Sequence, residues 1–148
     1  MITHLSEWAK RKPQAPFFCV QGDKQSIEYS YRRAHIAAAA LARELERYGM
    51  TANGTLACTM YNGTELVLLS LAAAYGGYTL ALLNPRLSAD ERQLRLVELE
   101  NATGEHGMDV LTNQMVNRLL IDATGFDATG FGLLPDDAAV LTRLQVEL

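Results

Sequence analysis

Residues 55–83 read TLACTMYNGTELVLLSLAAAYGGYTLALL, and this stretch decides the fold class. The run Thr55–Met60 predicts a strand, the apolar run Gly63–Tyr75 predicts a buried helix, and Tyr78–Leu83 predicts a second strand. Gly76-Gly77 stands where the helix should stop, because glycine readily ends a helix in the left-handed conformation. Two strands joined by a helix predict a parallel β-α-β unit, with the second strand buried on both faces.

The same stretch has an alternative interpretation as a membrane helix. Leu66–Leu83 carries no charged residue over 18 positions, a length at which a membrane span is considered. The glycine pair divides this run, and it lacks the basic flanks that orient membrane helices. A buried helix followed by a strand is therefore preferred, and no membrane span is predicted.

The segment before this unit predicts a helix and a hairpin. Leu5–Arg11 has the pattern of a short helix, with Thr3 as its cap and Trp8 facing inward. Phe17–Val20 and Ser26–Tyr29 resemble strands, and the turn residues between them predict a β-hairpin.

Two further helices carry recognisable end signals. Ser30 caps a long helix that runs to Tyr48 with a stripe of alanines and leucines, and Gly49 stops it. A second helix is expected over Ser88–Glu100, where Ser88 and Glu91 form a capping box. Glu91 and Arg95 are spaced for an ion pair along that helix.

A third strand is expected at Met108–Thr112 and a weak helix at Asn113–Leu120. Together these elements predict an α/β fold with a parallel sheet, flanking helices and an N-terminal β-hairpin. The length of 148 residues fits a single α/β domain over 1–148.

Composition narrows the function classes. Hydrophobic residues make up 49% and charged residues 20%, which is typical of a soluble globular protein. The net charge of −4 argues against nucleic-acid binding, and the basic cluster Lys10–Lys12 fits a solvated helix end. Cys19 and Cys58 stand among apolar strand residues and are expected in the core. With no apolar leader at the N-terminus, a cytoplasmic protein is expected.

Motifs that carry chemistry are scarce. His4, His35 and His106 stand in separate elements without ligand spacing, so no metal site is predicted. The glycine-rich stretch 123–132 lacks the Gly-Lys-Ser/Thr ending of a phosphate loop and is interpreted as a flexible acidic loop. No catalytic residue is predicted.

Asn84 and Arg86 are the weak candidates for ligand binding. With Pro85 they follow a predicted parallel strand at its carboxyl end, where ligands gather in such sheets. The alternative is a structural turn that leads into the capped helix, and this alternative is favoured.

Several motifs together suggest a family. They are Trp8-x4-Pro13-x2-Pro16-Phe17, Ile27-Glu-Tyr-Ser-Tyr31, Ala40-Leu-Ala-x-x-Leu45 with Gly49, Leu56–Glu65, and Leu71–Gly77 followed by Leu82–Arg92. This order resembles the N-terminal part of the adenylate-forming acyl-CoA synthetases, the AMP-binding ligase superfamily. The run LLNPRLS with its following Glu-Arg is similar to the o-succinylbenzoate–CoA ligase branch. The resemblance is good over residues 1–100 and poor over 101–148.

The resemblance implies a partial enzyme. A complete member uses ATP, Mg²⁺ and CoA, and holds the ATP phosphates in a Ser/Thr-Gly-rich loop with a lysine. Pro135–Thr142 resembles the strand leading into that loop, but the loop does not follow, and no lysine occurs after Lys24. The expectation is an N-terminal fragment of an ATP-dependent acid–CoA ligase that is inactive alone and needs no cofactor of its own.

Alternatives from other classes remain open. The chain could be a non-catalytic binding or assembly module, or a split-enzyme subunit that pairs with a complementing C-terminal synthetase chain. It could also form a homodimer through helix 66–75, if that apolar helix is exposed. A small nucleotide- or flavin-binding α/β protein is a further possibility.

Overall fold

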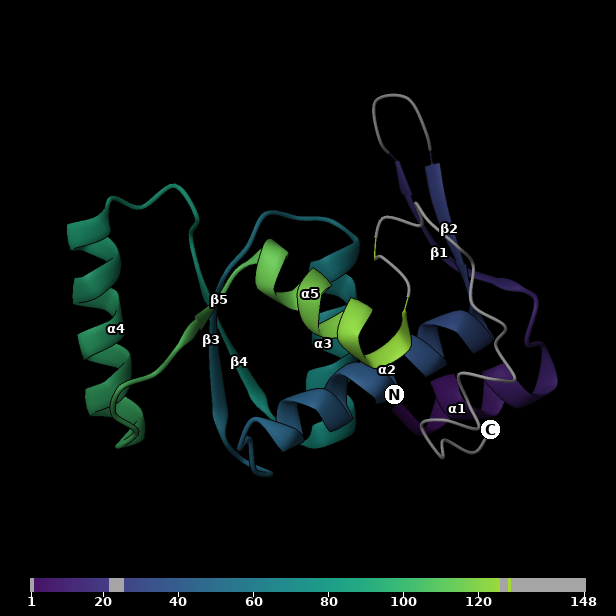
Figure 1. Ribbon diagram of the computed structural model, residues 1–148, viewed down its shortest axis with the longest axis horizontal. Helices are drawn as coiled ribbons and strands as arrows, with labels where there is room; N and C mark the ends of the chain where they lie inside the picture. The colour runs from purple at the N-terminus through teal and green to yellow at the C-terminus, as the bar shows by residue number, and fades with distance from the viewer. Residues whose placement is uncertain (1, 22–25, 126–127, 129–148) are drawn as a thin grey trace.

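The computed structural model describes residues 2–21, 26–125 and 128, and these form five helices and five strands (Figure 1). In chain order they are α1 (Ile2–Arg11), β1 (Pro16–Gln21), β2 (Ser26–Ser30), α2 (Tyr31–Arg47), β3 (Thr55–Thr59), α3 (Thr64–Gly76), β4 (Thr79–Leu83), α4 (Ala89–Thr103), β5 (Val110–Leu111) and α5 (Asn113–Thr124).

The three later strands form one parallel sheet in the order β4-β3-β5. Ala57 of β3 lies opposite Ala81 of β4 and Val110 of β5. Strands β1 and β2 pair antiparallel in a separate two-stranded sheet. The predicted α/β fold, with a parallel sheet, flanking helices and an N-terminal hairpin, is confirmed. The third strand is shorter than expected, because only Val110–Leu111 of Met108–Thr112 pairs with β3.

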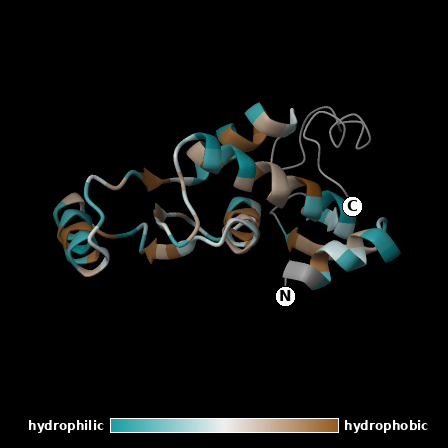
Figure 2. Ribbon diagram, turned by 90° about the horizontal axis from the view of Figure 1, so that it is seen from below, coloured by the Kyte–Doolittle hydropathy of each residue, from teal (hydrophilic) through white to brown (hydrophobic). Residues whose placement is uncertain are grey.

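Helices flank the parallel sheet on both sides. Both views place α4 on one side of the strands and α2, α3 and α5 on the other (Figures 1 and 2). Leu56 and Cys58 of β3 point into the core on the side of α2 and α3. Ala57 points to the opposite face and is 1% exposed, and Leu96 is the buried residue of α4. The core therefore lies mainly between the sheet and the larger helical layer.

The second strand of the deciding unit is not enclosed as expected. β4 lies at the edge of the sheet, and the Leu82 side chain is 64% exposed. The prediction that Tyr78–Leu83 is buried on both faces is therefore wrong, because an apolar run does not reveal whether a strand is central or at an edge. Within the described ranges, no helix is both long and apolar enough to cross a membrane.

Helix α3 is covered by its own chain. Leu68, Leu69, Ala72 and Ala73 are buried, and α3 packs against α2 and α5. The expected exposed apolar patch on helix 66–75 is therefore absent from these four positions. Gly77 ends the helix with φ 74°, which confirms the predicted glycine stop.

Helix α2 is the central helix of the fold. It contacts α1, α3 and α5, and its alanines let these neighbours approach closely. The Ser30 hydroxyl accepts a hydrogen bond from the backbone N–H of Arg33 at 3.1 Å, as the sequence predicts. Gly49, with φ 103°, follows the last turn at the predicted position.

The N-terminal aromatic residues depart from expectation. Helix α1 buries Leu5 and Ala9, which are four residues apart, whereas Trp8 is 40% exposed. Trp8 stacks on Tyr31 at 5.9 Å between ring centroids, and the ammonium of Lys12 lies over its ring. The prediction that Trp8 faces inward is wrong, because the α1 face that is buried passes through Leu5 and Ala9.

The two cysteines differ in their exposure to solvent. Cys58 is fully buried, as expected, but Cys19 on β1 is exposed, so its predicted core placement is wrong. From Phe17 to Gln21 exposed and half-buried residues alternate along β1, and Cys19 falls on the exposed side.

Helix α4 begins as predicted but pairs its charges differently. The Ser88 hydroxyl accepts from the N–H of Glu91 and donates to its carboxylate at 3.0 Å. Arg95 pairs with Glu98 at 3.1 Å rather than with Glu91. Residues 126–127 and 129–148, which include most of the glycine-rich stretch and all of Pro135–Thr142, lie outside the described residues.

Candidate ligand site at the carboxyl ends of the parallel strands

Strands β3, β4 and β5 end at the same edge of the sheet, because all three run in parallel. The loops that follow them, together with residues of α4 and α5, line an open cavity of about 410 Å³. Such an edge is where α/β sheets usually bind ligands. The lining residues are Thr59, Tyr61, Pro85, Arg92, Thr112, Asn113 and Gln114.

An asparagine holds two sides of this cavity together. The side-chain oxygen of Asn113 accepts from the N–H of Tyr61 at 2.9 Å, and its amide nitrogen donates to the Tyr61 carbonyl at 3.2 Å. This pair of bonds fixes the loop after β3 against the start of α5. Sequence reasoning missed it, because the two residues are 52 positions apart and only the fold brings them together.

The predicted candidates form the loop after β4. The side-chain oxygen of Asn84 accepts from the N–H of Arg86 at 2.9 Å, which closes a tight turn before α4. Both side chains are exposed, and neither residue lines the cavity, whereas Pro85 between them does. The structure thus shows a turn role for Asn84, and ligand binding by Asn84 or Arg86 stays a prediction.

Arg92 is the one basic residue among those that line the cavity. It lies on α4, four residues after the Ser88 cap and four before the buried Leu96. That spacing places Arg92 on the side of α4 that faces the sheet. The sequence did contain this signal, since a charged residue at an inward position of a helix is unusual and calls for a partner.

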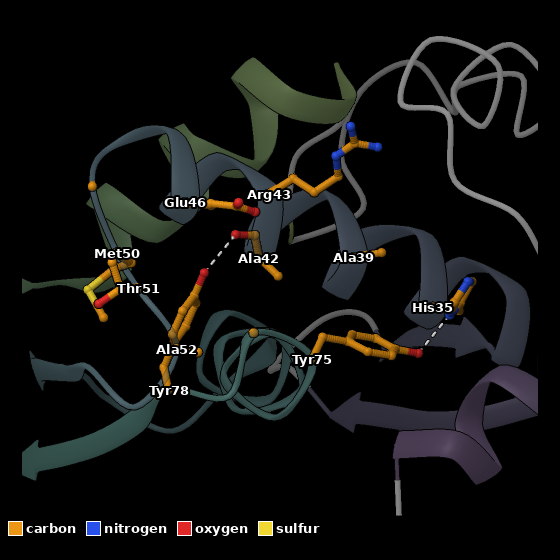
Figure 3. A pocket seen from close by; sticks show the side chains of 12 residues that line it. His35, Ala39, Ala42, Arg43, Glu46, Met50, Thr51, Ala52, Tyr75 and Tyr78 are labelled. Carbon is orange, nitrogen blue, oxygen red and sulfur yellow. Dashed lines mark hydrogen bonds between the residues drawn. The ribbon is translucent and has the colours of Figure 1, made fainter.

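A second, larger hollow lies beside the C-terminal half of α2. It has a volume of about 690 Å³, and its wall includes His35, Glu46, Tyr75 and Tyr78 (Figure 3). The Tyr75 hydroxyl lies 2.6 Å from Nδ1 of His35, and the Tyr78 hydroxyl donates to the carbonyl of Ala42 at 3.2 Å. Both tyrosines thus direct their hydroxyls at α2, which joins α3 and β4 to that helix.

Titration behaviour agrees with a structural role for these groups. Burial raises the pKa of Tyr75 to about 12, so its hydroxyl keeps its proton at neutral pH. Burial also raises the pKa of the Cys58 thiol, which disfavours the reactive thiolate. Neither group is prepared to act as a nucleophile or a base near pH 7.

The described residues also do not assemble a metal site. No three of their His, Cys, Asp and Glu side chains come together as a metal-binding group. His4 and His106 are exposed at distant places, and His35 is buried against Tyr75.

Several solved structures share this fold. The O-succinylbenzoate coenzyme A synthetase of Bacillus subtilis, in complex with ATP and magnesium ion, superposes with a TM-score of 0.61 and 20% identity over 78% of this chain and 33% of its own. The N-terminal subdomain of NpsA from Klebsiella oxytoca, in complex with 3-hydroxybenzoyl-AMSN, gives a TM-score of 0.65 and 16% identity over 91% of this chain and 34% of its own.

One curated relative matches part of the chain. The non-canonical nonribosomal peptide synthetase cpsA of Aspergillus campestris (strain IBT 28561) is 32% identical over 88 residues, which are 60% of this chain and 8% of that protein. The chain thus spans a small part of this relative and about a third of the two solved structures.

The family assignment rests on the sequence itself. Residues 5–102 match the AMP-binding enzyme family, which agrees with the fold and with the motifs between Trp8 and Arg92. The chain belongs to the AMP-binding enzyme family.

Proposed function

We propose that this chain forms the N-terminal part of an ATP-dependent acid–CoA ligase that works through an acyl-adenylate. The observation that supports this most is the motif Leu71–Arg92, which resembles the acyl-CoA synthetases and folds here as the end of α3, β4 and the start of α4. The fold likeness to the O-succinylbenzoate coenzyme A synthetase agrees with it. Two free cysteines fit a reducing compartment, and we place the protein in the cytoplasm.

We further propose that the 148 residues alone do not catalyse adenylation. In adenylation the carboxylate attacks the α-phosphorus of ATP and pyrophosphate leaves, and this step requires cations and donors that neutralise the developing charge on the phosphates. The sequence contains no Gly-Lys-Ser/Thr phosphate loop, and its three lysines all lie within the first 24 residues. A complementing C-terminal synthetase chain would then supply the missing groups. A homodimer is the alternative assembly, but its second copy would not add the phosphate loop.

A second candidate is an amino-acid-activating enzyme. The relative at 32% identity is named a nonribosomal peptide synthetase, and this name supports activation of an amino acid as the alternative. A non-catalytic binding or assembly module derived from the fold is the third candidate. The ligase and the amino-acid-activating enzyme differ in which acid they activate, whereas the non-catalytic module activates none.

The test is ATP–pyrophosphate exchange with the purified chain, first alone and then mixed with the C-terminal remainder of an O-succinylbenzoate coenzyme A synthetase. We expect no exchange from the chain alone. Exchange restored with aromatic or aliphatic acids, followed by thioester formation on CoA, supports the ligase. Exchange with amino acids alone favours the peptide-synthetase candidate, and exchange by the chain alone contradicts the proposed inactivity.

A further inference from the structure

We infer that the cavity at the carboxyl ends of β3, β4 and β5 binds an oxyanion, with Arg92 as the residue that receives it. The inference rests on the cavity itself and does not depend on which acid the enzyme activates. It assigns a binding role to Arg92, which takes part neither in the turn Asn84–Arg86 nor in the capping box of Ser88 and Glu91.

The cavity has the polarity that an anion requires. Its seven lining residues include one arginine, two threonines, one asparagine and one glutamine, and none of them is acidic. A site of this composition offers hydrogen-bond donors and one full positive charge, with no carboxylate among the lining residues to neutralise it. Glu91, the nearest acid in sequence, is committed to the Ser88 hydroxyl.

One donor of the Arg92 guanidinium is buried without an acceptor. Its Nε is fully buried and has no hydrogen-bond partner within the described part of the chain. Burying a guanidinium donor without an acceptor is costly, and native proteins rarely leave such a group unsatisfied. An anion in the cavity would provide that acceptor, and a planar guanidinium binds carboxylates and phosphates with two parallel hydrogen bonds.

The start of α5 adds a second source of positive potential. Thr112, Asn113 and Gln114 line the cavity, and they are the cap and first two residues of this 12-residue helix. The Thr112 hydroxyl accepts a hydrogen bond from the backbone N–H of Met115. It therefore does not cap the backbone N–H groups of Asn113 and Gln114. Helix N-termini attract negative charge, and this one points to the same space as Arg92.

Two kinds of ligand carry such a group. A phosphoryl group presents tetrahedrally arranged oxygens to an arginine, and a carboxylate presents two oxygens in a plane. Both groups occur on the substrates of adenylate-forming enzymes. Inorganic phosphate and acetate are therefore the two probes, used separately with the intact 148-residue chain at constant ionic strength.

The test follows the Arg92 Nε–H resonance by NMR during titration with each probe. We expect a saturable shift of this resonance, stronger with phosphate if the natural group is phosphoryl and stronger with acetate if it is a carboxylate. The Arg92→Gln variant should weaken binding at least about tenfold, since a charge-assisted hydrogen bond contributes roughly 1.5–3 kcal/mol. Arg95→Gln is the matched control, because Arg95 is exposed on the same helix, and it should bind like the wild type.

Stability measurements give an independent readout. Without an anion, Arg92→Met should cost little stability, because it removes a buried donor that has no acceptor. With phosphate or acetate, the wild type should gain melting temperature and this variant should not. The inference is overturned if neither probe shifts the Arg92 resonance saturably, if Arg95→Gln weakens binding as much as Arg92→Gln, or if Arg92→Met gains as much melting temperature as the wild type.

Discussion

The two glycines at the end of α3 should respond differently to the same substitution. A methyl group on Gly76 would overlap the outer ring atoms of Tyr78. That ring cannot withdraw easily, because its hydroxyl donates to the carbonyl of Ala42 on α2. Gly77 has no such clash, since the nearest atom to an added methyl is the Cβ of Ala52 at 3.8 Å, but its φ of 74° strains any residue with a Cβ.

The magnitudes follow from these two causes. Overfilling a packed site costs about 1–3 kcal/mol, and alanine returns roughly 0.5–1 kcal/mol of helix propensity at Gly76. We therefore expect Gly76→Ala to lose about 1–2 kcal/mol. Gly77→Ala should lose about 1 kcal/mol through backbone strain, and Gly77→Asn should lose less, because asparagine tolerates the left-handed region better.

Urea denaturation followed by far-UV circular dichroism measures both effects, and a double-mutant cycle separates them. Tyr78→Leu removes the ring atoms that Gly76→Ala would meet. In that background the cost of Gly76→Ala should vanish or become a small gain, whereas the cost of Gly77→Ala should stay the same. An equal cost of Gly76→Ala in both backgrounds would refute the packing argument.

Three further predictions concern the core, the cavity and the tyrosines. Leu69→Ala should destabilise the protein by about 2–5 kcal/mol in a urea titration because Leu69 is fully buried, whereas Leu94→Ala, at a residue 57% exposed, should change it by less than about 0.5 kcal/mol. Asn113→Ala should cost about 1–2 kcal/mol through the loss of two hydrogen bonds to Tyr61, and a Gln114→Ala control should cost clearly less; equal costs would remove the clamp role. The folded-state pKa of Tyr75 lies above its unfolded value of 10.0, so its contribution to stability is complete below pH 10 and is lost as the pH rises toward about 12. Stability curves of wild type and Tyr75→Phe over this range should differ in slope, and parallel curves would contradict the assignment.

Local signals predicted most of the elements. Ser30 and Ser88 mark helix starts, and Gly49 and Gly77 mark helix ends, because caps depend on the neighbouring few residues. The parallel arrangement followed from the alternation of helix and strand. Each of these features depends on a few neighbouring residues, so it can be predicted from a short stretch of sequence.

Long-range features could not be predicted in the same way. Whether β4 is central or at an edge depends on the order β4-β3-β5, which no short window encodes. The cavity joins Thr59, Pro85, Arg92 and Asn113 from three strand ends and two helices, so its members become neighbours only after folding. Asn84 and Arg86 do lie at the carboxyl end of β4, but the arginine that lines the cavity is six residues further along.

The central position of α2 has a consequence for synthesis on the ribosome. Helix α2 ends at Arg47, yet α5, one of the helices that cover it, is complete only at Thr124. At about 5–20 residues per second, this interval lasts roughly 4–15 s. During that time Leu41 and Leu45, which are buried in the finished fold, lack part of their cover. The nascent chain therefore presents an apolar helix surface to chaperones until its second half has emerged.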